Sequence, residues 1–244
     1  MMEMNHWLAV LLATDTPALS SPWVMRLGLT VGWALVLALL GAGLAWRLPL
    51  QGRRLVALAL ALWTLLPGPV TPDYWLGLAF HAPSLSAMLL CGWALQRLLF
   101  PGASRTAPAS LASAAEAGAG QREATVLTGG MLWPLVALGY LLLLDTFAVL
   151  PLQLYAWGFS PLLLLGLLAL SLLPWLLRGQ AGAAGPQLWL VPLALLLFAA
   201  TRLPTGNVWD ALLDPWLWLL LHGLLLRSIY RRLRPAPSPA AIRG

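Results

Sequence analysis

The sequence contains no lysine, so all 14 of its basic residues are arginine. This excludes mechanisms that need a lysine amine, such as Schiff-base chemistry with retinal or pyridoxal phosphate and nucleotide binding through a P-loop. Cysteine is nearly absent as well, because Cys91 stands alone and can form no disulfide within the chain. Cys91 lies in an apolar segment, where a free cysteine usually packs as a small hydrophobic residue.

Charged residues make up only 9% of the chain, whereas 60% of its residues are hydrophobic. So few charges cannot cover the surface of a soluble protein of 244 residues, and the apolar residues occur in long blocks. We therefore interpret the chain as an all-α, polytopic integral membrane protein, and expect it in a bacterial inner (cytoplasmic) membrane. Because the arginines flank the apolar blocks, we expect the lipid bilayer and other membrane proteins as partners, and no nucleic acid.

Seven apolar blocks are candidates for transmembrane helices. They cover residues 22–46, 55–70, 73–100, 125–148, 161–177, 186–201 and 215–230. Three blocks begin with a capping residue followed by proline, which favours a helix start, at Ser21–Pro22, Ser160–Pro161 and Asp214–Pro215. The block 55–70 is short, so it either crosses the membrane or is re-entrant, and the charge pattern favours crossing. Gly28 and Gly32 in the first block form a GxxxG pair, which lets another helix approach closely.

Seven crossings separate the charges into two sets. One side receives Arg47, Arg53, Arg54, Arg97, Arg105, Arg122, Arg178 and the five arginines from Arg227 to Arg243. The other side receives only Arg26 and Arg202, together with the acids Glu3, Asp15, Asp73, Asp145, Asp210 and Asp214. The positive-inside rule then predicts an N-terminus outside and a C-terminus in the cytoplasm.

Composition divides the chain into four parts. Residues 1–100 form an N-terminal membrane part with three spans, which a short apolar patch at residues 7–13 precedes at the membrane surface. Residues 101–124 are rich in alanine, glycine, serine and proline, and predict a flexible cytoplasmic linker. Residues 125–230 form a C-terminal membrane part with four spans, and residues 231–244 predict a disordered basic tail.

The third block, DYWLGLAFHAPSLSAMLLCGWALQRLLF, carries polar residues that a plain lipid-facing helix would lack. Pro83 removes a backbone hydrogen bond and frees a carbonyl that protein or water must satisfy, which predicts a broken helix facing the bundle interior. We expect His81, Ser84 and Ser86 to face that interior, opposite the seventh helix at the level of His222.

His81 and His222 each lie seven residues into a predicted span, or about 10 Å deep at the helical rise. Two facing imidazoles at one depth would suit a haem iron, so haem b bound by His81 and His222 is one alternative. In the other interpretation each histidine only bonds a neighbouring helix. We predict no other cofactor and no metal site.

The outer acids form the second candidate site. With His81, Ser84, Ser86 and His222, the residues Asp145, Asp214 and Arg26 would line a path for a substrate or proton, since ionisable groups at membrane depth often have a function. Asp73, Asp210 and Arg202 map to the same boundary. The alternative is that the aspartates cap helices and that Arg26 reaches toward the lipid headgroups.

No catalytic signature is present, and a triad built from Ser84 and His81 would lack a nucleophile elbow. We therefore favour a non-enzymatic subunit or accessory component of a membrane assembly. A small-solute or proton-coupled transporter with an outer polar cleft is the first alternative, and a membrane redox protein is the second. A lipid-modifying enzyme with its site at the outer boundary is the third.

Overall fold

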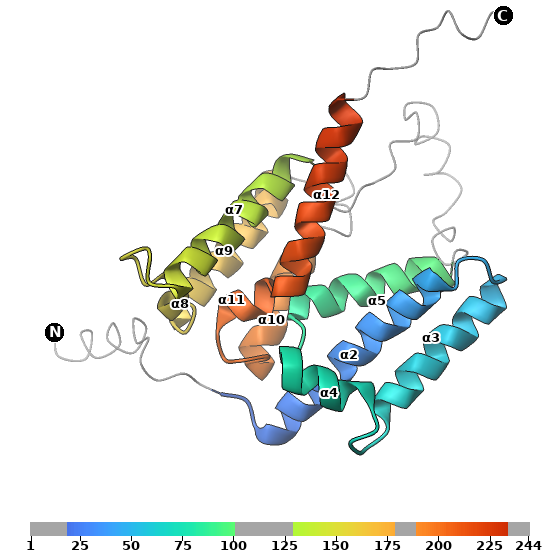
Figure 1. Ribbon diagram of the computed structural model, residues 1–244. Helices are drawn as coiled ribbons and strands as arrows, with labels where there is room; N and C mark the ends of the chain where they lie inside the picture. The colour runs from blue at the N-terminus through green and yellow to red at the C-terminus, as the bar shows by residue number, and fades with distance from the viewer. Residues whose placement is uncertain (1–18, 101–128, 179–188, 234–244) are drawn as a thin grey trace, which may run out of the picture.

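A computed structural model describes residues 19–100, 129–178 and 189–233, and within these ranges the chain is helical with no strand (Figure 1). The all-α prediction is therefore confirmed. The long helices are α2 (Pro22–Leu44), α3 (Leu50–Leu65), α5 (Leu85–Leu99), α7 (Gly129–Thr146), α9 (Pro161–Arg178), α10 (Leu190–Thr201) and α12 (Pro215–Leu233). Three short helices connect them: α4 (Pro72–Phe80), α8 (Leu154–Trp157) and α11 (Val208–Leu212).

One described helix, Pro22–Leu44, is long and apolar enough to cross a membrane by length and composition. Other apolar helical stretches have 10–17 residues and fall short of that length, at Leu85–Leu99, Leu132–Thr146, Pro161–Leu173 and Leu190–Thr201. The seven-span arrangement therefore stays a prediction. The apolar patch at residues 7–13, the linker at residues 101–124 and the tail beyond residue 233 lie outside the described residues.

Proline sets three helix starts as predicted, because α2, α9 and α12 begin at Pro22, Pro161 and Pro215. The second helix differs from its prediction. It begins at Leu50 instead of Leu55 and ends at Leu65, before Pro67. Arg53 and Arg54 are therefore helical: their Nε–H groups donate to carbonyls at the ends of two neighbouring helices, Ala42 of α2 (3.2 Å) and Leu99 of α5 (2.8 Å). Likewise, α12 continues to Leu233, past the predicted start of the tail.

The third apolar block is broken, as the proline predicted. Helix α4 ends at Phe80, His81 adopts a left-handed φ of 60°, and α5 starts at Leu85. The start of α5 lies against α2 at Gly32, where a Cβ would meet the Met88 side chain at 2.6 Å. Leu203 packs against Gly28 in the same way, because a Cβ on Gly28 would lie 2.7 Å from Leu203 Cδ1. The GxxxG pair therefore packs against other parts of the same chain.

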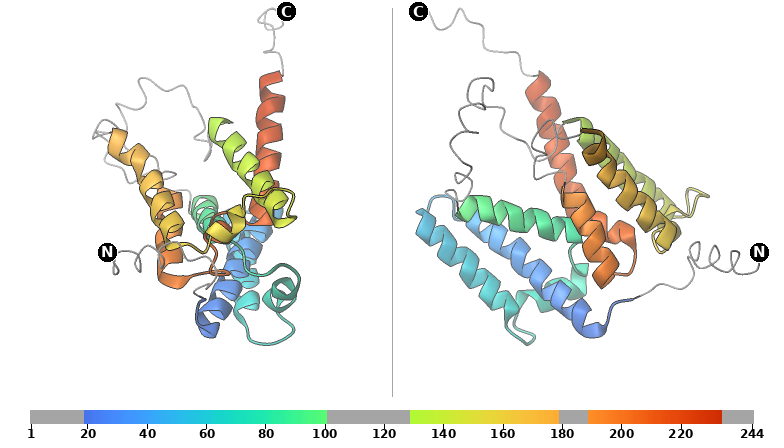
Figure 2. Two further views of the ribbon diagram at one scale, coloured as in Figure 1. Left: turned by 90° about the vertical axis from the view of Figure 1, so that its left-hand side faces the viewer. Right: turned by 180° about the vertical axis from the view of Figure 1, so that it is seen from behind.

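Helices α2, α3 and α5 lie together on one side of the molecule, and α7, α9 and α12 lie on the other (Figure 2). Helices α2 and α5 run in the same direction, because Gly32 lies beside Met88 while Ala42 clusters with Leu99. Helix α10 runs the opposite way, since Phe198 near its end packs with Leu85 at the start of α5. One end of the molecule thus carries the arginines of α3 and α5, and the other carries the α4–α5 break and the α10–α12 connection.

Candidate functional site

One buried polar group is a cluster that we call the Asp214 junction, formed by Ser84, Ser86 and Asp214. All three side chains are buried, with Asp214 8% exposed and Ser84 fully enclosed. Asp214 precedes Pro215, so its carboxylate is placed to cap α12, and Oδ1 accepts the Leu217 N–H at 2.7 Å. Its second oxygen, Oδ2, accepts the Ser84 N–H at 2.7 Å. One carboxylate therefore joins the break in the third block to the start of the last helix.

The two serines complete the junction. Ser84 Oγ accepts the Ala87 N–H at 3.1 Å and so caps α5. Ser86 Oγ donates to the carbonyls of Ala211 and Leu212 on α11. Because the N-termini of α5 and α12 both point at Asp214, their positive dipole ends stabilise a negative charge there.

A second polar group, which we call the Tyr155 network, lies on the connections between helices. The Tyr155 N–H donates to Asp145 Oδ2 at the end of α7, and the Tyr155 hydroxyl donates to Asp210 Oδ2, each at 2.7 Å. Thr205 Oγ1 donates to the same Asp210 oxygen at 2.5 Å. Burial raises the pKa of the Tyr155 phenol, and the hydrogen bond to Asp210 raises it further. Asp145 Oδ1 is buried and has no hydrogen-bond partner among the described residues.

Helix α8 with its C-cap residue Gly158 and the start of α11 are joined by several hydrogen bonds. Asn207, which is fully buried, caps α11 through Oδ1 and donates from Nδ2 to the Tyr155 carbonyl at 2.9 Å. The Val208 N–H donates to the Gly158 carbonyl at 2.9 Å. Gly158 lies so close that a Cβ would be 1.9 Å from Asn207 Oδ1. Sequence reasoning overlooked Thr205, Asn207 and Gly158; the signal was a capping asparagine within an otherwise apolar region.

The remaining outer residues do not join these groups. Asp73 lies in the first turn of α4 and accepts a hydrogen bond from the Thr30 hydroxyl at 2.8 Å. It shares no hydrogen-bond partner with Asp145 or Asp214. Arg26 is exposed on α2, and the Arg202 guanidinium lies over the Phe198 ring at 5.4 Å. The predicted outer cluster is thus divided into separate hydrogen-bonded groups.

The two histidines contact different helices. His81 is exposed, contrary to the expectation that it faces the interior, and its carbonyl accepts the Trp33 indole N–H at 2.9 Å. His222 Nδ1 lies 2.8 Å from the Trp218 carbonyl, and Nε2 lies 3.1 Å from the Tyr140 hydroxyl. Among the described residues no hydrogen bond or ring contact joins the two imidazoles. Iron ligation through His222 Nε2 would have to displace Tyr140.

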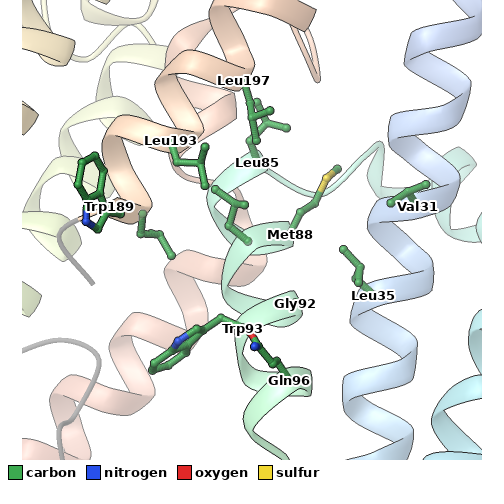
Figure 3. A pocket seen from close by; sticks show the side chains of 12 residues that line it. Val31, Leu35, Leu85, Met88, Gly92, Trp93, Gln96, Trp189, Leu193 and Leu197 are labelled. Carbon is green, nitrogen blue, oxygen red and sulfur yellow. The ribbon is translucent and has the colours of Figure 1, made fainter. Parts of the chain in front are cut away.

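An apolar cavity of about 430 Å³ lies between α2, α5 and α10 (Figure 3). Within the described ranges, no group of three or more histidine, cysteine or acidic side chains is arranged to hold a metal ion. Comparison of the chain with protein-family models, with curated proteins and with solved structures finds no match.

Proposed function

We propose that the protein is a multi-pass integral membrane protein and a non-enzymatic component of a membrane assembly. The observation that carries the second part is the Asp214 junction, whose carboxylate and hydroxyl groups bond mainly to backbone groups at helix ends. Polar groups used in this way fix how helices pack. They are poorly placed to exchange a proton with a substrate, because each is already engaged and buried.

Membrane residence is supported by the surface of the described helices. Large apolar side chains are exposed along α2, α3, α7, α9, α10 and α12, for example Leu58 and Leu62, which are 56% and 55% exposed. Soluble monomers rarely expose apolar area on this scale. Arg54 bonds the end of α5 that carries Arg97, so these arginines of the predicted cytoplasmic side lie together in the structure.

Reporter fusions test the topology. Fusions after Gly102, Gly179 and Gly244 are expected to report the cytoplasm, and fusions after Pro69, Ser160 and Gly206 the outside. A cytoplasmic signal at Pro69 would mean that α3 is re-entrant. For the assembly, the tagged protein is purified in mild detergent from its own membranes, and a stable membrane-protein partner is expected in stoichiometric amount. Purification as a lone chain with a measurable turnover would contradict the non-enzymatic proposal.

A proton or cation path is the second candidate, and the buried, unpartnered Asp145 Oδ1 favours it. Tyr155 lies between two carboxylates, because its N–H donates to Asp145 and its hydroxyl donates to Asp210. Proton flux into liposomes containing the purified protein tests this function, with Asp145→Asn expected to abolish the flux. Asp73→Asn is the matched control, because Asp73 Oδ1 is likewise buried without a partner but Asp73 lies outside the Tyr155 network.

A further inference from the structure

The cavity between α2, α5 and α10 is a groove with an apolar wall. Its sides are formed by Val31 and Leu35 of α2, Leu85 and Met88 of α5, and Leu193 and Leu197 of α10 (Figure 3). Its volume of about 430 Å³ is within the usual range of small-molecule sites, about 300–1,000 Å³. The groove therefore has the size and lining of a site for one apolar ligand or chain.

The two ends of the groove differ in chemistry. Leu85 and Leu197 form one end, beside the Asp214 junction, whereas Trp93 and Gln96 form the other (Figure 3). The Arg97 guanidinium lies 4.0 Å from the centre of the Trp93 ring, so a fixed positive charge stands at that second end. Tryptophan and arginine together are typical of the boundary between lipid tails and headgroups. The ligand that fits is long and apolar with a negative group at one end.

We propose that the groove binds one acyl chain of an anionic phospholipid, with the lipid phosphate held at Arg97 and Gln96. This inference rests on the proposed membrane residence of the protein. The phosphate would then lie at the end of α5 that the arginine asymmetry assigns to the cytoplasm. A guanidinium pairs well with phosphate oxygens, and the Gln96 amide supplies a further donor.

The groove is too small to enclose a helix from a partner protein. A helix of 15 residues and 10 Å diameter occupies about 1,800 Å³, so only some of its side chains could enter a groove of about 430 Å³. A single hydrocarbon chain is much thinner than a helix. The volume therefore favours a lipid chain as the occupant.

Gly92 provides a way to fill the groove without disturbing the helix. It lines the cavity, and a Cβ at this position meets no atom within 4 Å. A leucine there projects into the space that the acyl chain would occupy, and it also favours the helix more than glycine does. Gly166 on α9 is a matched control, because its Cβ also meets nothing within 4 Å and it lies outside the groove.

The test uses the full chain in nanodiscs that contain either phosphatidylglycerol or phosphatidylcholine with a photoactivatable group on the acyl chain. After illumination, labelled peptides are mapped by mass spectrometry. We expect labelling concentrated on α5 and α10, about fivefold stronger with phosphatidylglycerol, since one arginine contributes roughly that preference. Gly92→Leu should reduce this labelling several-fold, Gly166→Leu should not, and Arg97→Gln should remove the preference for the anionic lipid.

Labelling spread over all lipid-facing helices, and unchanged by Gly92→Leu, would overturn the proposal. A preference for phosphatidylglycerol that survives Arg97→Gln would overturn the assignment of the headgroup site. Photocrosslinking of the groove to another protein in native membranes would also overturn it. The proposed membrane residence is tested separately by cell fractionation. If that proposal is wrong, the protein will be missing from the membrane fraction before any lipid is tested.

Discussion

Asp214 Oδ2 accepts the backbone N–H of Ser84, 130 residues earlier in the chain, at 2.7 Å. This bond joins the break between α4 and α5 to the start of α12. The same carboxylate caps α12, so one side chain satisfies backbone donors at two helix N-termini. Its removal would leave both donors buried without a partner.

We therefore expect Asp214→Ala to lower the free energy of unfolding by about 2–6 kcal/mol, since two buried donors lose their partner and each costs about 1–3 kcal/mol. Asp214→Asn keeps one acceptor oxygen and should cost less. Unfolding titrations in mixed micelles measure both. Asp73→Ala, which removes a single hydrogen bond to Thr30, is the control, and a loss at Asp214 no larger than at Asp73 would contradict the role of the junction.

Gly158→Ala tests the contact between the end of α8 and the residue that caps α11. The new Cβ would lie 1.9 Å from Asn207 Oδ1, and Asn207 is fully buried, so the two segments must separate. We expect a loss of about 1–3 kcal/mol in the free energy of unfolding. Gly166→Ala, whose Cβ meets open space, should stabilise its helix by up to about 1 kcal/mol. Equal thermal stability of the two variants would count against the close contact.

The Tyr155 network should make stability depend on pH at the alkaline end. Folding raises the pKa of Tyr155 above its ordinary value of 10.0, so the folded state holds the phenol proton more tightly than the unfolded state. The resulting stability is complete below pH 10.0 and is lost as the pH rises toward the folded-state pKa. Tyr155→Phe lacks it and should be less stable by about 1 kcal/mol at neutral pH.

The measurement is the unfolding free energy of wild type and Tyr155→Phe across this pH range. The difference should be constant near neutrality and should narrow above pH 10.0. Tyr140→Phe, a tyrosine that contacts His222 instead of a carboxylate, serves for comparison. A difference that grows with pH would show that the hydrogen bond to Asp210 is not made by the neutral phenol.

The α4–α5 break should expose position 81 and hide position 86. In a background with Cys91→Ala, a cysteine replacing His81 is expected to react several-fold faster with a thiol reagent than one replacing Ser86, which is 4% exposed. Mass spectrometry of the labelled protein in detergent gives both rates. Faster reaction at position 86 would mean that the break is open to solvent and that the Asp214 junction is incompletely formed.

Local chemistry was sufficient to predict part of this fold. Proline after a capping residue predicted the starts of α2, α9 and α12, and Pro83 predicted the break, because proline acts through its own backbone geometry. The start of α3 was mispredicted, because Arg53 and Arg54 were assigned to a polar loop before the helix. In the structure Arg53 and Arg54 find acceptors on α2 and α5, and those acceptors are distant in sequence.

The candidate site was predicted in its members but not in its pairings. Ser84, Ser86 and Asp214 were chosen separately, as polar residues at a break and at a helix start, and the structure brings them together. His81 and His222 were chosen as a pair, and the structure assigns them different partners. A depth along a helix can be counted from sequence, but the direction of a side chain around the helix depends on the neighbouring helices.

The sequence by itself determined the helical class, the apolar blocks, the arginine asymmetry and the helix starts at Pro22, Pro161 and Pro215, because these follow from composition and from contacts between residues close in the chain. Only the tertiary structure decided that Asp214 meets Ser84, that Asn207 locks against Gly158, and that α2, α5 and α10 leave a groove between them. Those relations depend on which helices become neighbours, and that choice is made by packing over the whole molecule.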